Sequence, residues 1–213
     1  MTPGMIIAVD GPAASGKGTI AKALARHYNL PHLDTGLLYR AVAATVRRLE
    51  LDPTREADAV AACDFDELTL ADPVLREEEI GKLASVVSAH PLVRAALLQR
   101  QKRFAHQEGG AVLDGRDIGT VIAPDADAKL FIRATPTIRA RRRHNELISH
   151  GASVSFDQVL ADIRARDTRD SSRSTAPLVP ANDAALLDTS FLSIEASIEK
   201  AIALVEARRR KES

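Results

Sequence analysis

The fold of this chain is decided by one stretch, Gly11-Pro12-Ala13-Ala14-Ser15-Gly16-Lys17-Gly18-Thr19. Two glycines with four residues between them, followed by a lysine, allow the backbone to curl with its N–H groups pointing inward, where they bind phosphate oxygens. The apolar run Met5–Val9 directly before this loop predicts a buried strand. Ile20, Leu24 and Tyr28 follow at four-residue spacing and predict an amphipathic helix over 17–28, whose N-terminal end also attracts anions. This order predicts a nucleotide-binding α/β protein, and a glycine-rich turn with an incidental lysine is the alternative.

The end of the loop narrows the class of nucleotide-binding protein. Lys17 can reach the outer phosphates of a nucleoside triphosphate, and Thr19 offers a hydroxyl to a phosphate oxygen or to water on Mg²⁺. Gly18 stands directly after the lysine, where the general motif has Ser or Thr. The ending Gly-Lys-Gly-Thr resembles that of nucleoside monophosphate kinases rather than that of GTPases or motor ATPases. The chain also contains no Asn-Lys-x-Asp sequence, which argues against a GTPase switch.

Short apolar runs alternate with helical patterns along the rest of the chain. Strands are predicted at 111–113, 129–132 and 186–187, with a weaker one at 68–70. Helices are predicted over 36–50, 76–89 and 91–107, from Pro136, over 156–167, and in the segment that carries Ile194, Ile198, Ile202 and Val205. Alternating strands and helices form parallel sheets covered on both faces, so we predict a three-layer α/β fold around a central parallel five-stranded sheet. Ligands then bind at the sheet edge where the strand-to-helix loops open.

Composition argues against several classes of protein. The 213 residues fit one domain, and 29 basic and 29 acidic side chains give a net charge of zero. Zero charge and few aromatics (five Phe, two Tyr and no Trp) argue against nucleic-acid binding. The lone Cys63 excludes an internal disulfide, and the six histidines show no metal-binding spacing. Without a membrane-span pattern or signal-peptide features, we expect a cytoplasmic protein that acts on small molecules.

Three further segments carry a more specific pattern. They are Leu33-Asp34-Thr35-Gly36 with Tyr39-Arg40, Asp114-Gly115-Arg116-Asp117-Ile118-Gly119, and Arg166-Asp167-Thr168-Arg169-Asp170 leading to Arg173 and Ala176-Pro177-Leu178-Val179-Pro180. Together with the phosphate-binding loop, they resemble the bacterial cytidylate kinases over essentially the whole chain. The resemblance implies a P-loop NTPase fold and ATP-dependent phosphorylation of CMP and dCMP to CDP and dCDP with Mg²⁺. We also expect a monomer that binds neither nucleic acid nor membrane.

Arginines are the residues best suited to this chemistry. Transfer between two nucleotides brings many negative charges together, and the planar guanidinium binds phosphate oxygens bidentately while staying charged. The resemblance implies that Arg40, Arg116 and Arg173 bind the acceptor phosphate. The other residues that it assigns to the acceptor nucleotide are Thr35, Tyr39, Arg166 and Asp170, with Arg166 and Asp170 near the ribose and Tyr39 packed on the nucleotide.

The base must also be distinguished from uracil and the purines. Cytosine donates from its exocyclic amine and accepts at N3 and O2, so a carboxylate suits the amine and an arginine suits the acceptors. The resemblance implies a base pocket of Ser85, Arg94 and Asp117. Such a pocket discriminates strongly, because the wrong base leaves its polar groups without partners.

Two further assignments have open alternatives. Asp114 ends a predicted strand, where an acid can act on Mg²⁺ through water; equally, its carboxylate can order the loop by accepting backbone N–H groups or pair with Arg116. Arg139, Arg142 and Arg143 precede the break at 151–153 and are interpreted as arginines of a mobile lid over the triphosphate, with Arg142 assigned to transfer. The alternative for each of these three is a solvated helix face.

We expect one kinase unit over 1–213. Within it, residues 1–35, 86–138 and 170–213 form the predicted core, 36–85 an insert that binds the nucleoside monophosphate, and 139–169 the lid. The insert is shorter than in the larger bacterial cytidylate kinases, and Thr35 stands where a serine is familiar.

Two other functions compete with this interpretation. One is a P-loop kinase for another nucleoside monophosphate or a small-molecule acceptor. The other is a non-catalytic ATP-binding module. The segments at 114–119 and 166–173 favour the first interpretation, because a kinase with a hydroxyl acceptor has no evident need for their arginines.

Overall fold

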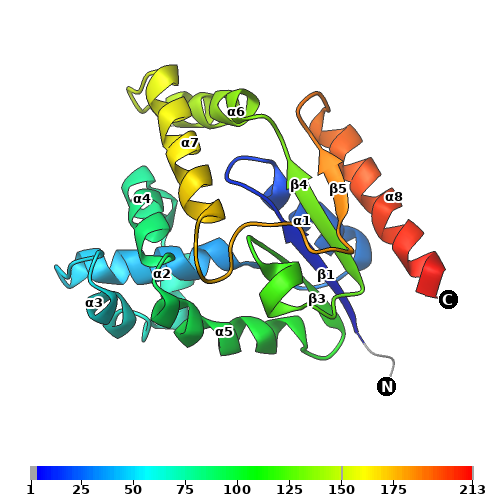
Figure 1. Ribbon diagram of the computed structural model, residues 1–213, viewed down its shortest axis with the longest axis horizontal. Helices are drawn as coiled ribbons and strands as arrows, with labels where there is room; N and C mark the ends of the chain where they lie inside the picture. The colour runs from blue at the N-terminus through cyan, green and yellow to red at the C-terminus, as the bar shows by residue number, and fades with distance from the viewer. Residues whose placement is uncertain (1–3, 150, 213) are drawn as a thin grey trace. The chain divides into compact units, whose positions relative to one another are not determined.

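The central element of the computed structural model is a five-stranded sheet in the order β2-β3-β1-β4-β5 (Figure 1). The structure describes residues 4–149 and 151–212. The strands are β1 (Met5–Asp10), β2 (His32–Asp34), β3 (Gly110–Gly115), β4 (Ala128–Arg133) and β5 (Ala185–Asp188). β1 pairs in parallel with β3 and with β4, and β4 pairs in parallel with β5. The predicted α/β fold with a five-stranded sheet is therefore confirmed.

The prediction of a strand at 68–70 was wrong. Residues Glu67–Ala71 form a 3₁₀ helix (η1), which begins where the Asp66 side chain accepts a hydrogen bond from the backbone N–H of Leu68 at 2.8 Å. Leu68 is 80% exposed, so it does not behave as a core strand residue. The fifth strand is instead β2, whose sequence His-Leu-Asp lacks an apolar run.

All of the helices except α3 (Glu56–Ala61), which was not predicted, lie close to their predicted positions. They are α1 (Lys17–Tyr28), α2 (Thr35–Arg48), α3 (Glu56–Ala61), α4 (Glu78–Val87), α5 (Pro91–Ala105), α6 (Pro136–Ser149), α7 (Phe156–Ser171) and α8 (Ile194–Glu212). α7 begins with a capping box, in which Ser155 and Gln158 satisfy each other's backbone N–H groups. A short π-helix, η3 (Ile118–Ile122), directly follows Asp117.

Contacts divide the chain into two compact units. The first contains Met1–Leu33 and Ala105–Ser213, and the second contains Asp34–Phe104. The second unit therefore includes α5, which lies in the predicted core. In it α2 packs on α4, around the fully buried Leu38, Leu75 and Ile80.

The core of the first unit lies between the sheet and the helices α1 and α8, which also contact each other. Its buried side chains are aliphatic and include Ile7, Val9, Leu24, Val112, Leu130 and Val205. A smaller cluster joins α6 and α7, which lie side by side in Figure 1, to Ala13 of the phosphate-binding loop. The core thus fixes the loop between β1 and α1, while α6 and α7 pack onto it.

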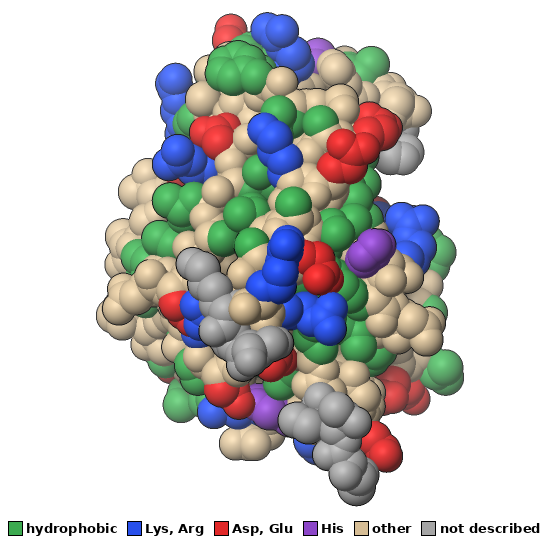
Figure 2. Space-filling model, turned by 90° about the vertical axis from the view of Figure 1, so that its right-hand side faces the viewer, with side chains coloured by type: hydrophobic (Ala, Val, Ile, Leu, Met, Phe, Trp, Pro, Cys, Tyr) green, Lys and Arg blue, Asp and Glu red, His purple; other side chains and the backbone are tan. Residues whose placement is uncertain are grey.

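Among the described residues, no helix combines the length and the apolar character that a membrane crossing requires. The face of the molecule shown in Figure 2 mixes basic and acidic side chains, in keeping with 29 positive and 29 negative residues in the chain.

Candidate active site

The loop between β1 and α1 has the backbone conformation that its glycines allow. Gly16 caps α1 in the left-handed region, with φ of 90°. A side chain at Gly11 would place its Cβ 2.1 Å from the carbonyl oxygen of Ile132, so only glycine fits against β4. Glycine is therefore favoured at position 16 by the left-handed backbone and at position 11 by the close carbonyl of Ile132.

A buried hydroxyl supports the assignment of this loop to phosphate. The Ser15 side chain is fully buried, and its Oγ has no hydrogen-bond partner within the described part of the chain. It lies toward Gly11, because a Cβ at that glycine would be 3.2 Å from Ser15 Oγ. A buried hydroxyl without a partner costs free energy, and a phosphate oxygen in the loop would satisfy it. The residues present thus fit a nucleoside triphosphate.

Two arginines of α6 bind the outside of the phosphate-binding loop. Arg139 Nη1 donates to the carbonyl of Ala13 at 3.1 Å, and Arg142 Nη1 donates to the carbonyl of Ser15 at 3.2 Å. Thr189 Oγ1 donates to the same Ser15 carbonyl at 2.9 Å, and Arg142 Nη2 donates to the carbonyl of Thr189 at 2.6 Å. These bonds satisfy the loop carbonyls and restrict the loop backbone from the side of α6.

The three arginines of the predicted lid therefore differ in their surroundings. Arg139 is only 3% exposed and forms a two-pronged ion pair with Asp167 of α7, at 2.9 and 2.5 Å. Arg143 pairs with Glu146 one helical turn away, at 2.9 Å. Arg142 is half-buried and, like Arg139, donates to a carbonyl of the phosphate-binding loop. Its part in phosphoryl transfer stays a prediction.

Asp114 lies at the end of β3 beside the first turn of α1. Its side chain is 2% exposed, and its Oδ2 lies 2.8 Å from His32 Nε2. A Cβ built on Gly18 would be 3.8 Å from Asp114 Oδ1, which places this carboxylate next to the phosphate-binding loop. The position fits an acid that holds Mg²⁺ through water, together with the hydroxyl of Thr19. His32 had no specific role in the sequence analysis, because no spacing connects it to Asp114.

A buried carboxylate brings two of the predicted phosphate-binding arginines together. Asp170 accepts from Arg116 Nε at 2.8 Å with one oxygen and from Arg173 Nη2 at 2.5 Å with the other. Burial alone would raise the pKa of Asp170, but the charges of Arg116 and Arg173 outweigh it and hold this pKa below its ordinary value. Asp170, which the resemblance placed near the ribose, thus bridges guanidinium groups from two distant loops.

The acceptor residues of the second unit form their own group. Arg94 lies over the ring of Tyr39, with its Cζ 5.5 Å from the ring centroid, and its side chain is buried, as is Ser85. Arg40 Nη1 donates to the carbonyls of Leu75 at 2.7 Å and Glu77 at 3.2 Å. Thr35 is buried at the start of α2, directly after the N-cap Asp34.

Gly81 in α4 is a residue that sequence reasoning missed. A Cβ there would be 2.8 Å from Arg40 Nη2, so the absence of a side chain at Gly81 lets this guanidinium lie against α4 in its present position. Two groupings stay predictions. One places Arg40 at the same acceptor phosphate as Arg116 and Arg173, and the other places Asp117 in one base pocket with Ser85 and Arg94.

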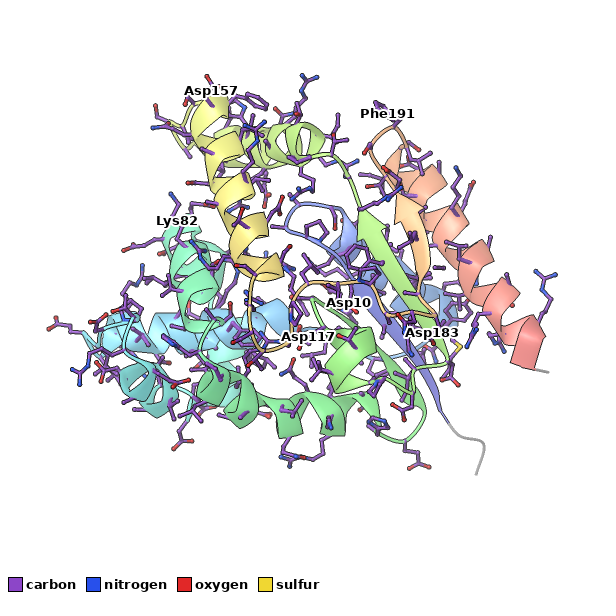
Figure 3. All side chains as sticks on the ribbon, viewed as in Figure 1. Asp10, Lys82, Asp117, Asp157, Asp183 and Phe191 are labelled. Carbon is purple, nitrogen blue, oxygen red and sulfur yellow. The ribbon has the colours of Figure 1, made fainter. Side chains whose placement is uncertain are left out.

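The second missed residue is Asp10, the last residue of β1. Its carboxylate accepts hydrogen bonds from the backbone N–H groups of Ile118 at 2.9 Å and Gly119 at 2.8 Å. Burial raises the pKa of Asp10 to about 7, against the two hydrogen bonds and with a contribution from the negative charge of Asp117. Asp10 and Asp117 lie close together in Figure 3. In the sequence Asp10 reads as the turn residue that ends a strand.

Replacing Asp10 by asparagine should change how stability depends on pH. The unfolded carboxyl ionises near 3.8 and the folded one near 7, so between these values the folded state alone keeps the proton. The free energy of unfolding of the wild type should then fall relative to Asp10→Asn as pH rises, by up to about 1.4 kcal/mol per pH unit. Urea unfolding of both proteins from pH 4.5 to 8 measures this difference.

A matched control is Asp125→Asn. The hydrogen bond from His106 lowers the pKa of Asp125, so this carboxyl is ionised in both states from pH 4.5 to 8 and the pair should show nearly parallel profiles. Parallel pH profiles for the wild type and Asp10→Asn would show that Asp10 titrates normally and contradict the expectation.

The side chains of the described residues form no group of three or more His, Cys, Asp or Glu placed to hold a metal ion. The N-terminal end of α1 offers main-chain amides, and Arg116 and Arg173 offer guanidinium groups, both of which suit the binding of phosphates.

Two solved structures share this fold over nearly the full chain. An uncharacterised protein from Eubacterium ventriosum ATCC 27560 is similar with a TM-score of 0.55 and 17% identity, over 95% of this chain and 98% of that one. A gluconokinase from Sinorhizobium meliloti 1021 is similar with a TM-score of 0.53 and 14% identity, over 98% of this chain and 95% of that one. At these identities the likeness concerns the fold alone.

Sequence relatives are much closer. A cytidylate kinase of Xanthobacter autotrophicus is 60% identical over 205 residues, which are 96% of this chain and 99% of that protein. A cytidylate kinase of Azorhizobium caulinodans is 56% identical over 205 residues, with 96% and 100% covered. The family model described as cytidylate kinase matches residues 7–207. The chain therefore belongs to the cytidylate kinase family.

Proposed function

We propose that this chain transfers the terminal phosphoryl group of ATP to CMP and dCMP, giving ADP and CDP or dCDP. An oxygen of the acceptor phosphate forms the new bond to the γ-phosphorus, and the bond from this phosphorus to the bridging oxygen of ADP breaks. The observation that carries the proposal is the pair Arg116 and Arg173 held by Asp170, since two guanidinium groups fixed in this way suit an acceptor phosphate. Family membership and two relatives named cytidylate kinase support the choice of acceptor.

The triphosphate binds in the loop 11–19. The loop amides and the N-terminal end of α1 hold the phosphates, Lys17 neutralises the charge that builds up on the outer ones, and Ser15 Oγ gains a partner. Mg²⁺, when bound near Thr19 and Asp114, supplies further neutralisation of the phosphate oxygens. No general base is required, because an oxygen of the acceptor phosphate is already ionised near neutral pH.

Arginine side chains provide most of the contacts that we propose for the acceptor phosphate. Arg40, Arg116 and Arg173 bind and orient this phosphate, so that the two nucleotides meet with their phosphates end to end. Arg142 is held near the triphosphate by its bonds to Ser15 and Thr189. Thr35, Tyr39 and Arg166 complete the acceptor site, with Asp170 acting through the arginines that it bridges.

Base selectivity comes from Ser85, Arg94 and Asp117. The Asp117 carboxylate accepts from the exocyclic amine of cytosine, and Arg94 donates to its ring acceptors. All three side chains are buried, so an unsuitable base would leave buried polar groups without partners. We assign the reaction to the cytoplasm, in line with the single cysteine of the chain. We also expect the protein to act on its small-molecule substrates as a monomer.

A coupled assay with each nucleoside monophosphate tests this proposal. With ATP and Mg²⁺, kcat/KM for CMP and dCMP should exceed that for AMP, GMP and UMP by roughly 100-fold or more, as expected of a polar pocket. Equal or better turnover of AMP, GMP or UMP would overturn the base-pocket assignment. A complete lack of transfer, with ATP binding intact, would indicate the non-catalytic module.

A further inference from the structure

Asp10 connects the two loops on which the proposed reaction depends. It is the last residue of β1 and is followed directly by Gly11 of the phosphate-binding loop. Its register partner on β3 is Gly115, which is followed by Arg116 and Asp117. The two substrate loops therefore leave neighbouring parallel strands at matching positions, and the Asp10 carboxylate spans the gap between them.

The two hydrogen bonds of Asp10 fix the backbone just beyond Asp117. Ile118 and Gly119 are both buried, so their N–H groups have no water to bond if the carboxylate is removed. A buried donor without a partner costs about 1–3 kcal/mol, which is enough to displace a short loop. These two residues also begin η3, so the carboxylate acts where the acceptor loop turns into this helix.

A carboxylate meets this need better than any neutral side chain of the same size. Each of the two N–H groups bonds its own oxygen of Asp10, whereas asparagine offers one oxygen and an amide that would face the second donor. Burial and the neighbouring Asp117 make the ionised form costly here, as the raised pKa of Asp10 shows. A buried acid retained at such a cost, at the junction of two substrate loops, indicates a role beyond stability.

The direct surroundings of Asp10 leave little freedom to this contact. A Cβ at Gly119 would be 3.5 Å from Asp10 Oδ2 and 3.2 Å from Lys129 Cδ. Lys129 itself is held by Asp183 at 2.8 Å and by the carbonyl of Pro124. The Asp10 carboxylate and the Lys129 stem thus both lie beside Gly119.

We propose that Asp10 is a positioning residue, which sets the loop carrying Arg116 and Asp117 in register with the phosphate-binding loop. The inference rests on the proposed function, because it takes these two residues as acceptor-binding groups. Asp10 touches neither nucleotide in this scheme and acts through the backbone of Ile118 and Gly119. Its loss should therefore impair the use of CMP while leaving the binding of ATP in place.

The test compares Asp10→Asn with the wild type in steady-state kinetics and in ATP titrations by calorimetry. We expect KM for CMP to rise roughly tenfold and kcat to fall by a similar factor, since one or two hydrogen bonds are lost. The Kd for ATP should stay within about twofold of the wild-type value. A general loss of structure would instead weaken ATP binding as well. Asp183→Asn, which alters a surface acid on Lys129 of the neighbouring strand, is the matched control and should change none of these values.

Each other outcome overturns the inference in a distinct way. An unchanged KM for CMP in Asp10→Asn would show that the contact does not position the loop. Equal losses for ATP and CMP would show a purely structural role. If Arg116→Met retains full activity in the same assay, the assignment of the acceptor site fails instead. Should Asp10→Asn not fold, Asp10→Glu keeps both oxygens on a longer side chain, and the same split between CMP and ATP is expected.

Discussion

Arg116→Met is expected to lower kcat for phosphoryl transfer to CMP by roughly 100- to 10,000-fold, the range seen when a group that stabilises transferring phosphate is removed. Methionine keeps the length and apolar contacts of the side chain but carries no charge. ATP binding should survive, because the triphosphate is held by the loop 11–19 rather than by Arg116. Stopped assays of CDP formation and calorimetric titration of ATP measure the two quantities.

The control for this variant is Arg209→Met. Arg209 lies exposed on α8 and pairs with Glu206, so its loss should leave kcat unchanged. Arg173→Met should behave as Arg116→Met does, since both guanidinium groups are held by Asp170. Transfer at more than a tenth of the wild-type rate in both variants would contradict the role of this pair.

Asp170→Leu should destabilise the fold by about 3–5 kcal/mol, the usual result of removing one partner from a buried charge cluster. The substitution leaves Arg116 and Arg173 with buried positive charge and no shared carboxylate. Because these charges hold the pKa of Asp170 low, its contribution to stability is present above about pH 4 and is lost as pH falls through the folded-state pKa. The difference in unfolding free energy should therefore be large at pH 7 and shrink in acid.

A double-mutant cycle isolates this effect. Asp170→Leu, Arg116→Met and their combination are compared by urea unfolding at pH 7. The double variant should be less destabilised than the sum of the two single variants, because removing both partners leaves less unpaired charge. Strict additivity would show that the 2.8 Å contact between Arg116 and Asp170 carries no net coupling.

The sequence predicted the surroundings of the phosphate-binding loop well. The helix over 17–28 has the predicted bounds, because its apolar spacing and the preceding glycines leave little choice of structure. β1 differs from the prediction by one residue, Asp10, since a charged side chain at the end of an apolar run does not look like part of a strand. Local pattern is sufficient wherever the local residues determine the structure.

Long-range contacts account for what the sequence did not predict. The strand β2 has no apolar run of its own, whereas the pattern at 68–70 falls in a 3₁₀ helix that begins at the Asp66 cap. The hydrogen bonds of Asp10 join residues more than 100 positions apart, and the pairing of His32 with Asp114 spans 82 positions. The sequence predicted Arg139 to be a lid arginine or to face solvent, but its guanidinium donates to the Ala13 carbonyl and pairs with Asp167. None of these pairs produces a residue spacing that can be recognised in the sequence.

The most direct measurement is a crystal structure with CMP and a non-hydrolysable ATP analogue bound together. We expect the analogue's phosphates on the amides of residues 11–19, with the CMP phosphate within hydrogen-bond distance of the guanidinium groups of Arg40, Arg116 and Arg173. The pyrimidine should contact Ser85, Arg94 and Asp117. A CMP phosphate bound elsewhere, with these three guanidinium groups directed away from it, would contradict the account.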